Sequence, residues 1–407
     1  MAANRLTDAL NNNGVKAKML VRDKLTDSLT VTSLPPSWRL RWHFLWERLV
    51  IWFHLHLRRT HLFEADIANS GTDITRLPEF READVIHLHW VNQGMLSLKG
   101  IRRILESGKP VVWTMHDIWP ATAICHLTFD CRRFEQSCNH CRLLPGGGGS
   151  NDLAARVWRR KQQLLAGHQI TFVACSQWLA AEAGKSALLK GQTVVSVPNP
   201  IDSHYRPGDK ASARQTLGLP NDRKLILFVS QRVTNPFKGM DYLVEACRQI
   251  AAEKDGPLSK TGVIILGGHA EEIISQLPLP AWPLGYVSDP QVIARVYQSA
   301  DVFVLPSLSE NLPNTIMESM ACGVPCVGFR VGGIPEMIDH RRTGYVANYR
   351  DAADLAQGIR YVLAEADAEA LRQSCLQKVA SCYSSQSVAR RYTEIYEHAL
   401  RFKYKKG

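Results

Sequence analysis

Short runs of β-branched and other apolar residues, separated by helix-length segments, constrain the fold of this chain more than any other feature. Near-continuous apolar strands that alternate with amphipathic helices are typical of parallel sheets buried on both faces. The sequence therefore predicts an α/β protein with doubly wound sheets. The runs are DVIHLHW (84–90), PVVWTMHD (110–117), ITFVACS (170–176), TVVSVPN (193–199), KLILFVS (224–230), GVIILGG (262–268), DVFVLPS (301–307) and PCVGFRVGG (325–333).

The length of 407 residues exceeds what one hydrophobic core usually supports, so two domains are expected. The alternation is interrupted by PNPIDSHYRPGDK (198–210), which is rich in proline and polar residues. We expect domains over 1–200 and 201–380, and a carboxyl-terminal helix over 381–407 that packs back toward the first domain. Two such sheets would face each other across a cleft, at the carboxyl ends of strands where open α/β sheets bind ligands.

The composition is that of an ordinary soluble protein, with 45% hydrophobic and 21% charged residues. No apolar run approaches the ~20 residues of a membrane-spanning helix, and no secretion signal opens the chain, so we expect a cytoplasmic protein. A net charge of +11 favours anionic partners such as phosphorylated substrates or acidic lipids, or else reflects scattered surface charge. No nucleic-acid-binding motif accompanies this charge, and we expect no nucleic acid partner.

Two carboxylates stand out in the stretch SLSENLPNTIMESMACGVPC (307–326). Glu310 is predicted in the loop after a strand, and Glu318 lies in the helix that follows. Backbone N–H groups near Asn311 and Leu312 would form an anion site at the helix start, with Pro313 in the first turn. Carboxylates repel phosphate, so the glutamates are predicted to bind vicinal hydroxyls of a sugar. For Glu318 alone, a glutamate favoured by the helix dipole explains the residue equally well.

Two cations follow an earlier predicted strand: Arg232, and Lys238 at the start of the next helix. Either cation alone would be interpreted as a solvated surface charge. Projecting into one cleft, they could neutralise a diphosphate, arginine by a fork and lysine as a point charge. Together with the acidic loop, they predict a site for a nucleotide-diphosphate sugar.

These residues bring the chain close to a known family. Through SQRVTNPFKG (230–239) and SLSENLPNTIMESMACGVPCVGFRVGGIPEMIDHRRTGYV (307–346), it resembles the retaining glycosyltransferases of family four, which have the two-Rossmann GT-B fold. The resemblance implies an acceptor-side first domain and a donor-binding second domain. It further implies that Glu310 holds hydroxyls of the transferred sugar, Glu318 the ribose, and Arg232 with Lys238 the diphosphate.

The amino-terminal half also resembles this family, particularly bacterial exopolysaccharide and O-antigen enzymes, through VIHLHWVNQGMLSL (85–98) and WTMHDIWPATAICH (113–126). His116 matches the family histidine that approaches the donor sugar, although a histidine at a strand end is more often structural. LGYVSD (284–289) falls where the family places the base, which makes Tyr286 and Val287 candidate contacts. The family's first strand and glycine-rich turn have no counterpart, because this chain opens in a helix. We expect a start assigned too late; the alternative is an inactive chain.

The resemblance implies a retaining hexosyltransferase that moves a sugar from a UDP- or GDP-linked donor to a glycan or lipid-linked acceptor, in bacterial surface polysaccharide synthesis. Glu310 and His116 are the predicted catalytic residues, and no metal is required for catalysis. Front-face attack assisted by the donor phosphate is expected, and double displacement with Glu310 as nucleophile is the alternative. The rival functions are a nucleotide-sugar epimerase of the same fold and a non-catalytic homologue that binds glycan or protein.

A cluster of four cysteines lies outside these motifs, in CHLTFDCRRFEQSCNHC (125–141). Four thiolates this close in a cytosolic protein predict a structural zinc site, and free thiols or disulfides are the alternatives. The candidate ligands are Cys125, Cys131, Cys138 and Cys141.

A second cluster, WRLRWHFLWERLVIWFHLHLRR (38–59), reads as an aromatic and arginine-rich helix. Such a helix could lie in an anionic membrane interface, which would place the protein peripherally on the inner face of the plasma membrane. The alternative is a domain helix whose aromatic residues, such as Trp38, Trp42 and Phe53, belong to the core.

Overall fold

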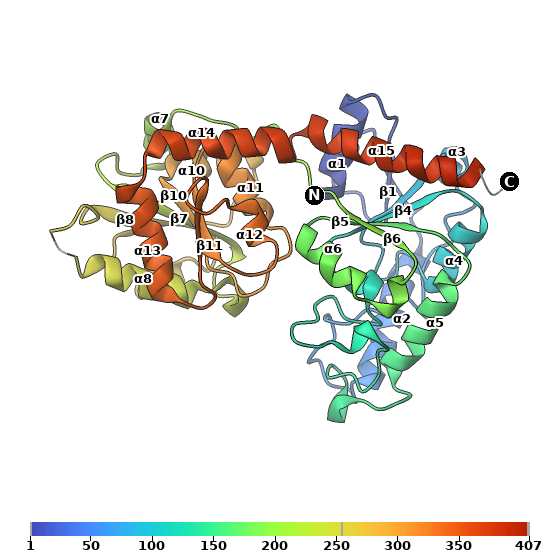
Figure 1. Cartoon of the computed structure of the whole chain (residues 1–407). Helices are drawn as coiled ribbons and strands as arrows, with labels where there is room; N and C mark the ends of the chain where they lie inside the picture. Colours follow the sequence, from blue (N-terminus) through green and yellow to red (C-terminus); the bar gives the residue numbers. More distant parts are fainter. Residues whose placement is uncertain (1, 254, 405–407) are drawn as a thin grey trace. The chain divides into compact units, whose positions relative to one another are not determined.

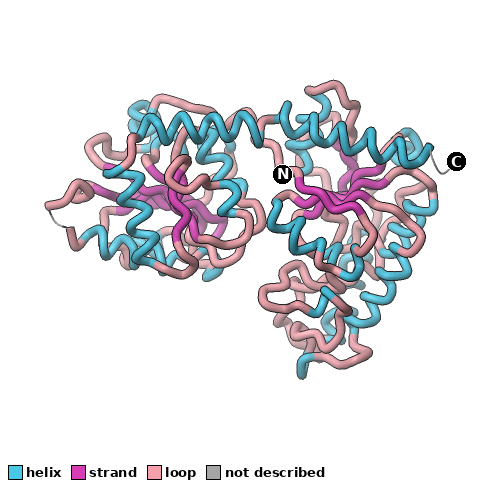
Figure 2. Tube along the Cα trace, viewed as in Figure 1, coloured by secondary structure: helices cyan, strands magenta, loops and turns pink. Residues whose placement is uncertain are grey.

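The computed structural model describes residues 2–253 and 255–404. The chain divides into two compact units: unit 1 comprises Met1–Val197 and Ala389–Gly407, and unit 2 comprises Pro198–Val388. In each unit helices cover a parallel sheet (Figures 1 and 2). Helix α15 (Ser385–Tyr404) begins in unit 2 and continues into unit 1. These observations confirm the predicted α/β class.

Unit 2 contains a six-stranded sheet in the order β12-β11-β10-β7-β8-β9, and every neighbouring pair is parallel. Helices α8 and α13 cover one face, and α7, α10, α11 and α14 cover the other (Figure 1). The strands are β7 (Lys224–Arg232), β8 (Thr261–Gly268), β9 (Ala281–Gly285), β10 (Val302–Leu305), β11 (Cys326–Phe329) and β12 (Gly344–Ala347). The helices are α7 (Lys210–Leu217), α8 (Met240–Ala251), α9 (Glu271–Ile274), α10 (Pro290–Ser299), α11 (Asn314–Ala321), α12 (Ile334–Met337), α13 (Ala352–Arg360) and α14 (Ala368–Lys378).

The core of unit 2 explains why its strands read as continuous apolar runs. Ile226 and Phe228 of β7 pack with Val263 of β8 and Val304 of β10, and all four are fully buried. Helix α8 adds residues such as Leu243 from its inner face. Burying one such side chain stabilises the fold by about 1.5–3 kcal/mol. These buried contacts hold the strands in place, and they fix where the loops at the strand ends begin.

Unit 1 contains two separate sheets. Strands β3-β4-β5-β6 form a parallel sheet, and β1 pairs in parallel with β2. The strands are β1 (Met19–Val21), β2 (Val31–Ser33), β3 (Ile86–Leu88), β4 (Val111–Met115), β5 (Thr171–Ala174) and β6 (Thr193–Ser196). The helices are α1 (Ala2–Asn12), α2 (Trp38–His54), α3 (Pro78–Glu82), α4 (Leu98–Glu106), α5 (Leu153–Leu165) and α6 (Gln177–Gly184).

The sequence analysis did not predict four of the strands, β1, β2, β9 and β12. The first two have three residues each, too few for a periodic signal. Strand β9 contains Pro283, which is tolerated because β9 is the edge of its sheet. Strand β12 begins with Gly344, a residue that ordinarily argues against a strand.

Candidate active site

Two loops of unit 2 meet where the strand order reverses, between β7 and β10, and the loop after β11 joins them. The chain runs outward in one direction through β8 and β9, and in the other through β11 and β12. Such a switch point opens a crevice at the carboxyl ends of the strands. The loops touch one another: Leu308 N–H donates to the Phe237 carbonyl at 2.8 Å, and Gly333 N–H donates to the Asn311 carbonyl at 2.9 Å.

Lys238 and Glu310 form the central contact of this site. The Lys238 Nζ lies 2.5 Å from the Glu310 Oε1, and their side chains are 31% and 12% exposed. Lys238 is the last residue of a short 3-10 helix, Pro236–Lys238. The Asn235 side chain caps the start of this helix. A cation and a carboxylate that are 72 residues apart in sequence are thus joined at one loop junction.

Two glycines allow the loops to approach this closely. Gly239 has a φ of +69°, and a Cβ there would lie 1.9 Å from the Pro306 carbonyl oxygen. Gly332 has a φ of +56°, and a Cβ there would lie 1.6 Å from the Glu310 carbonyl oxygen. Only glycine meets both demands. Sequence reasoning missed this role, although Gly239 directly follows Lys238 and Gly332 begins a Gly-Gly pair.

Glu318 faces inward from α11 and is 6% exposed. The Tyr297 hydroxyl donates a hydrogen bond to its Oε2 at 3.3 Å. Burial, and then the Glu318 carboxylate, raise the pKa of Tyr297, so the hydroxyl remains a donor. Helix α11 starts at Asn314 with Pro313 as its N-cap, one residue later than predicted. The partner Tyr297 fixes one carboxylate oxygen of Glu318, and sequence reasoning did not identify it.

The other predicted donor-site residues lie at the same edge of the sheet. Asn311 and the buried Leu312 lie in the loop before α11. Arg232 ends β7, and its Nε donates to the Thr234 hydroxyl at 3.0 Å. Tyr286 and Val287 follow β9, and the Tyr286 side chain is 63% exposed. Among these predicted donor-site residues, Lys238 and Glu310 are the pair whose side chains form an ion pair.

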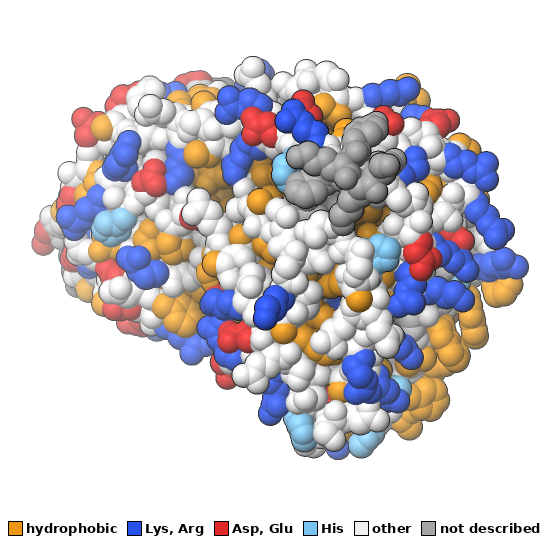
Figure 3. Space-filling model, turned by 45° about the vertical axis from the view of Figure 1, so that its right-hand side comes forward, with side chains coloured by type: hydrophobic (Ala, Val, Ile, Leu, Met, Phe, Trp, Pro, Cys, Tyr) orange, Lys and Arg blue, Asp and Glu red, His pale blue; other side chains and the backbone are white. Residues whose placement is uncertain are grey.

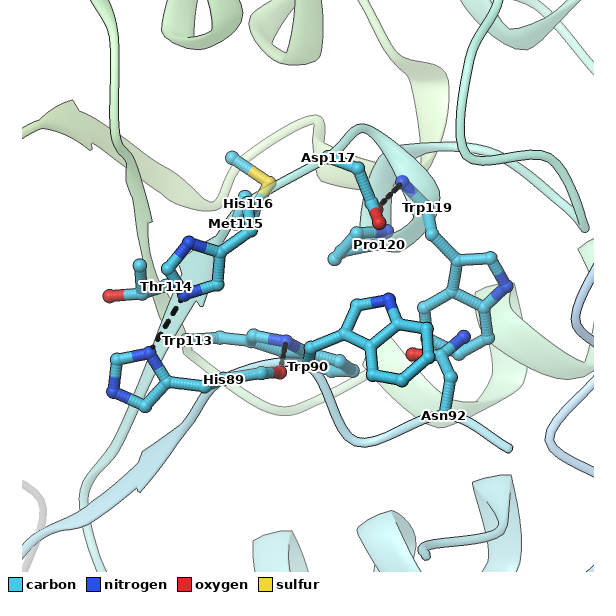
Figure 4. Close-up of a pocket in the computed structure, with 10 residues that line it drawn as sticks. All are labelled: His89, Trp90, Asn92, Trp113, Thr114, Met115, His116, Asp117, Trp119 and Pro120. Atoms are coloured by element: carbon cyan, nitrogen blue, oxygen red, sulfur yellow. Dashed lines mark hydrogen bonds between the residues drawn. The ribbon is translucent and has the colours of Figure 1, made fainter. Parts of the chain in front are cut away.

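His116, the predicted catalytic histidine, follows β4 in unit 1. Its Nε2 lies 3.0 Å from the Nδ1 of His89, and Figure 4 shows the two rings facing each other. Burial lowers the pKa of His116 and, more strongly, that of His89, so both imidazoles are neutral at pH 7. The two histidines, together with Trp90 and Asn92, line a pocket of about 10 Å³. This pocket has room for about one water molecule.

A buried ionic network, which the sequence analysis did not predict, lies beside this pocket. The Nη2 of Arg48 on α2 donates to Asp66, whose other oxygen lies 2.7 Å from the His126 Nε2. The His126 Nδ1 lies 2.7 Å from Asp117, next to His116. Burial alone would lower the pKa of His126, but hydrogen bonds to Asp117 and Asp66 outweigh it and raise the pKa to about 9. The network ties α2 to the loop after β4.

The four clustered cysteines are free thiols and are partly buried. Within residues 2–253 and 255–404, no three His, Cys, Asp or Glu side chains are arranged to hold a metal ion. The zinc site of Cys125, Cys131, Cys138 and Cys141 stays a prediction.

The arrangement of helices and parallel sheets places the chain in a structural class, the GT-B fold, which has two Rossmann-like domains. Sucrose-phosphate synthase from Thermosynechococcus elongatus shares the fold with a TM-score of 0.64 and 17% identity, over 98% of this chain and 92% of that chain. HepE of Anabaena in complex with UDP-glucose shares it with a TM-score of 0.54 and 18% identity, over 77% of this chain and 79% of that chain. The predicted GT-B fold is confirmed.

Residues 223–365, which contain the whole Lys238–Glu310 site, match the family described as Glycosyl transferases group 1. An uncharacterized glycosyltransferase of Methanocaldococcus jannaschii is 30% identical over 361 residues, which cover 83% of this chain and 90% of that protein. The chain belongs to this glycosyltransferase family.

Other relatives match a smaller part. D-inositol 3-phosphate glycosyltransferase 2 of Catenulispora acidiphila is 32% identical over 183 residues, 42% of this chain and 42% of that protein. This chain therefore spans less than half the length of that relative.

Proposed function

We propose that this protein transfers a sugar from a nucleotide-diphosphate donor to a hydroxyl group of an acceptor. The observation that carries the proposal is the Lys238–Glu310 contact at the switch point of unit 2, in the loop that leads into α11 and its inward-facing Glu318. A cation and two carboxylates at such an edge suit a ligand that has both phosphates and hydroxyls. The UDP-glucose bound to HepE, a protein of the same fold, supports a nucleotide-sugar donor.

Within this proposal, Lys238 and Arg232 neutralise the diphosphate, while Glu310 accepts hydrogen bonds from the sugar and Glu318 from the ribose. The contact between Lys238 and Glu310 supports this division of roles, because a ligand with a phosphate next to a sugar hydroxyl needs a cation next to an acceptor. Tyr297 donates a hydrogen bond to one oxygen of Glu318 and so helps to orient the carboxylate that is proposed to accept the ribose hydroxyl. Asn311, Leu312, Tyr286 and Val287 complete the donor site by resemblance.

The proposed reaction retains the anomeric configuration and needs no metal cofactor. Lys238, Arg232 and the α11 amino terminus offset the charge of the departing diphosphate. The acceptor oxygen attacks the anomeric carbon on the face that the diphosphate leaves, and the leaving phosphate oxygen takes the acceptor proton. His116, as a neutral imidazole, is proposed to contribute one hydrogen bond to the sugar. A glycosyl adduct trapped on Glu310 would overturn this mechanism in favour of double displacement.

Helix α2 supports the proposal of a lipid-linked acceptor in surface glycan synthesis, because its apolar side chains face outward. Trp38, Trp42 and Phe53 are 72%, 50% and 59% exposed, so the alternative that they belong to the core is wrong. The helix instead buries Glu47, which accepts the N–H groups of Ile67 and Ala68. Further exposed apolar residues of α2 are Leu45, Trp46 and Leu49.

The charge on this helix fits an anionic lipid surface. Exposed arginines flank the aromatic side chains at both ends: Arg39, Arg41, Arg58 and Arg59. Hydrophobic side chains gather at the lower right margin of Figure 3, at the height of α2 in Figure 1. Tryptophan and arginine together are typical of interfacial helices. Among the described residues, no helix is long and apolar enough to cross a bilayer. We propose peripheral binding through this face of α2.

Liposome co-sedimentation tests the membrane proposal. The protein should sediment with anionic vesicles and not with neutral ones. Trp42→Ala and Arg41→Gln should each reduce the bound fraction, whereas Trp178→Ala, at a tryptophan 40% exposed on α6, serves as the matched control. Equal sedimentation of all three variants would contradict the proposal.

Calorimetric titration with UDP-, GDP- and other nucleotide sugars tests the proposed activity. At least one should bind to the full chain, and turnover with an acceptor should release the nucleoside diphosphate. Glu310→Gln keeps the size of the side chain and should weaken binding of the intact sugar nucleotide more than binding of the free diphosphate. If no nucleotide sugar binds, the proposed function fails.

A further inference from the structure

The loop that follows β4 carries His116, and Asp117 holds the chain directly after it. Both carboxylate oxygens of Asp117 are engaged within unit 1. Oδ1 accepts the Trp119 N–H at 2.9 Å, as Figure 4 shows, and Oδ2 lies 2.7 Å from the His126 Nδ1. The Asp117 side chain is therefore fixed at two points, one residue away from His116.

His126 is also held on its other side. Its Nε2 lies 2.7 Å from Oδ2 of Asp66, so both ring nitrogens face carboxylate oxygens. Ionised carboxylates only accept hydrogen bonds, which means that both nitrogens of His126 carry a proton and donate. The His126 and Asp66 side chains are 16% and 1% exposed, so water competes little for these charge-assisted bonds.

Asp66 is fixed independently of His126. Its other carboxylate oxygen accepts a hydrogen bond from Nη2 of Arg48, and its N–H donates to the Ile124 carbonyl at 2.8 Å. The Asp66 carbonyl accepts the indole N–H of Trp119 at 2.8 Å. Asp66 should therefore stay in place when His126 is changed.

Four hydrogen bonds close a ring, which we call the cycle. It runs from Asp117 to Trp119, from Trp119 to Asp66, from Asp66 to His126 and from His126 back to Asp117. Hydrogen bonds weaken steeply away from their preferred angles, so each bond of the cycle restrains the geometry of the others. Buried charges are weak evidence for stability, because desolvation offsets their attraction. The directional bonds of the cycle are better suited to holding the loop in one conformation.

We propose that His126 is a positioning residue, which orients Asp117 and through it the loop that places the His116 imidazole beside His89. The His116 Nε2 lies 3.0 Å from the His89 Nδ1, a contact that requires a particular direction of the chain after β4. His126 need not touch a substrate in this role. The inference rests on the proposed function, because His126 affects sugar transfer through His116.

Two amide substitutions separate the two bonds of His126. The asparagine amide nitrogen is as many bonds from Cβ as Nδ1, so His126→Asn can keep the bond to Asp117 and loses the one to Asp66. The glutamine amide nitrogen matches Nε2 in the same way, so His126→Gln can keep the bond to Asp66 and loses the one to Asp117. Asp66 is the more buried carboxylate, at 1% against 20% exposure, so His126→Asn should destabilise the fold more. The positioning role predicts the opposite order for activity.

Steady-state kinetics of the full chain, with the nucleotide sugar that calorimetric titration identifies, test this order. The kcat should fall about tenfold or more for His126→Gln and about threefold or less for His126→Asn, because a small displacement of a catalytic group slows transfer strongly. The difference between the variants should disappear in a His116→Ala background, which lacks the residue through which His126 acts. Equal kcat values, an order that follows stability, or a difference that persists without His116 would overturn the proposal.

Nitrogen-15 NMR of the full chain with labelled histidine tests the positioning without turnover. His116→Ala assigns the His116 ring signals by their absence. These signals should shift in His126→Gln and stay close to their wild-type values in His126→Asn. If no nucleotide sugar is turned over, the proposed function fails, and the ring signals still decide the positioning. Unchanged His116 signals in both variants, or equal shifts in both, would refute it.

Discussion

Replacing Lys238 with methionine tests the centre of the unit 2 site. The change keeps most of the side-chain stem and removes the ammonium group 2.5 Å from Glu310. A hydrogen bond to a charged group contributes about 1.5–3 kcal/mol, and the 31% exposure of Lys238 favours the lower half of that range. Since about 1.4 kcal/mol is a tenfold change, the affinity for a nucleoside diphosphate should fall about tenfold to about fiftyfold.

The matched control is Lys210→Met. Lys210 also contacts a carboxylate, Asp301, at 2.7 Å, but this pair lies just before β10, at the opposite edge of the sheet. Asp301 keeps a second partner in Arg214, so the fold should tolerate the change. Calorimetric titration with UDP and GDP should show weaker binding for Lys238→Met alone. Equal effects of both variants, or none in either, would refute the assignment of Lys238 to the diphosphate.

Two further outcomes follow from the structure, and a third tests the zinc site predicted from the sequence. The loss of unfolding free energy caused by His126→Gln should be largest below pH 6.5, at about 3 kcal/mol, and should vanish as the pH rises through about 9. Chemical denaturation of both proteins at several pH values measures this loss. A loss that does not change with pH would contradict the raised pKa of His126. Gly332→Ala combines a positive φ with a clash against the Glu310 carbonyl and should destabilise unit 2 by more than about 2 kcal/mol. Gly218→Ala, where φ is also positive but a Cβ would meet open space, should cost about 1 kcal/mol. Similar melting temperatures of the two variants would show that the loop at Gly332 moves to relieve the clash. Metal analysis of purified protein should find one zinc per chain if the four cysteines bind it, and Cys138→Ser should abolish that content; metal-free protein would end the zinc prediction.

Much of the unit 2 site was predictable from sequence, because its residues follow strands that can be recognised individually. Glu310 and Lys238 each come just after an apolar run, and the carboxyl ends of parallel strands meet at one edge. The direct contact between them was not predictable. It depends on β7 and β10 being neighbours, and on Gly239 and Gly332 letting three loops approach one another.

The orientation of α2 shows a different limit. Its aromatic residues recur at helical spacing, which suits both a core helix and an interfacial one. The buried partners of Glu47 and Arg48 decide between these alternatives, since they lie at residues 62–68 and can satisfy two charged side chains. A hydrophobic pattern alone does not reveal a helix whose charges face inward.

The sequence by itself determined the α/β class and the positions of the acidic and basic loops, since each depends on local patterns of apolar and charged residues, and its resemblance to known enzymes indicated a glycosyltransferase. The tertiary structure decided which loops touch and which face of α2 is exposed. These features depend on strand order and on partners far apart in the chain, such as Asp66 for Arg48 and Glu310 for Lys238. Local sequence patterns do not indicate which residues far apart in the chain become neighbours in the fold.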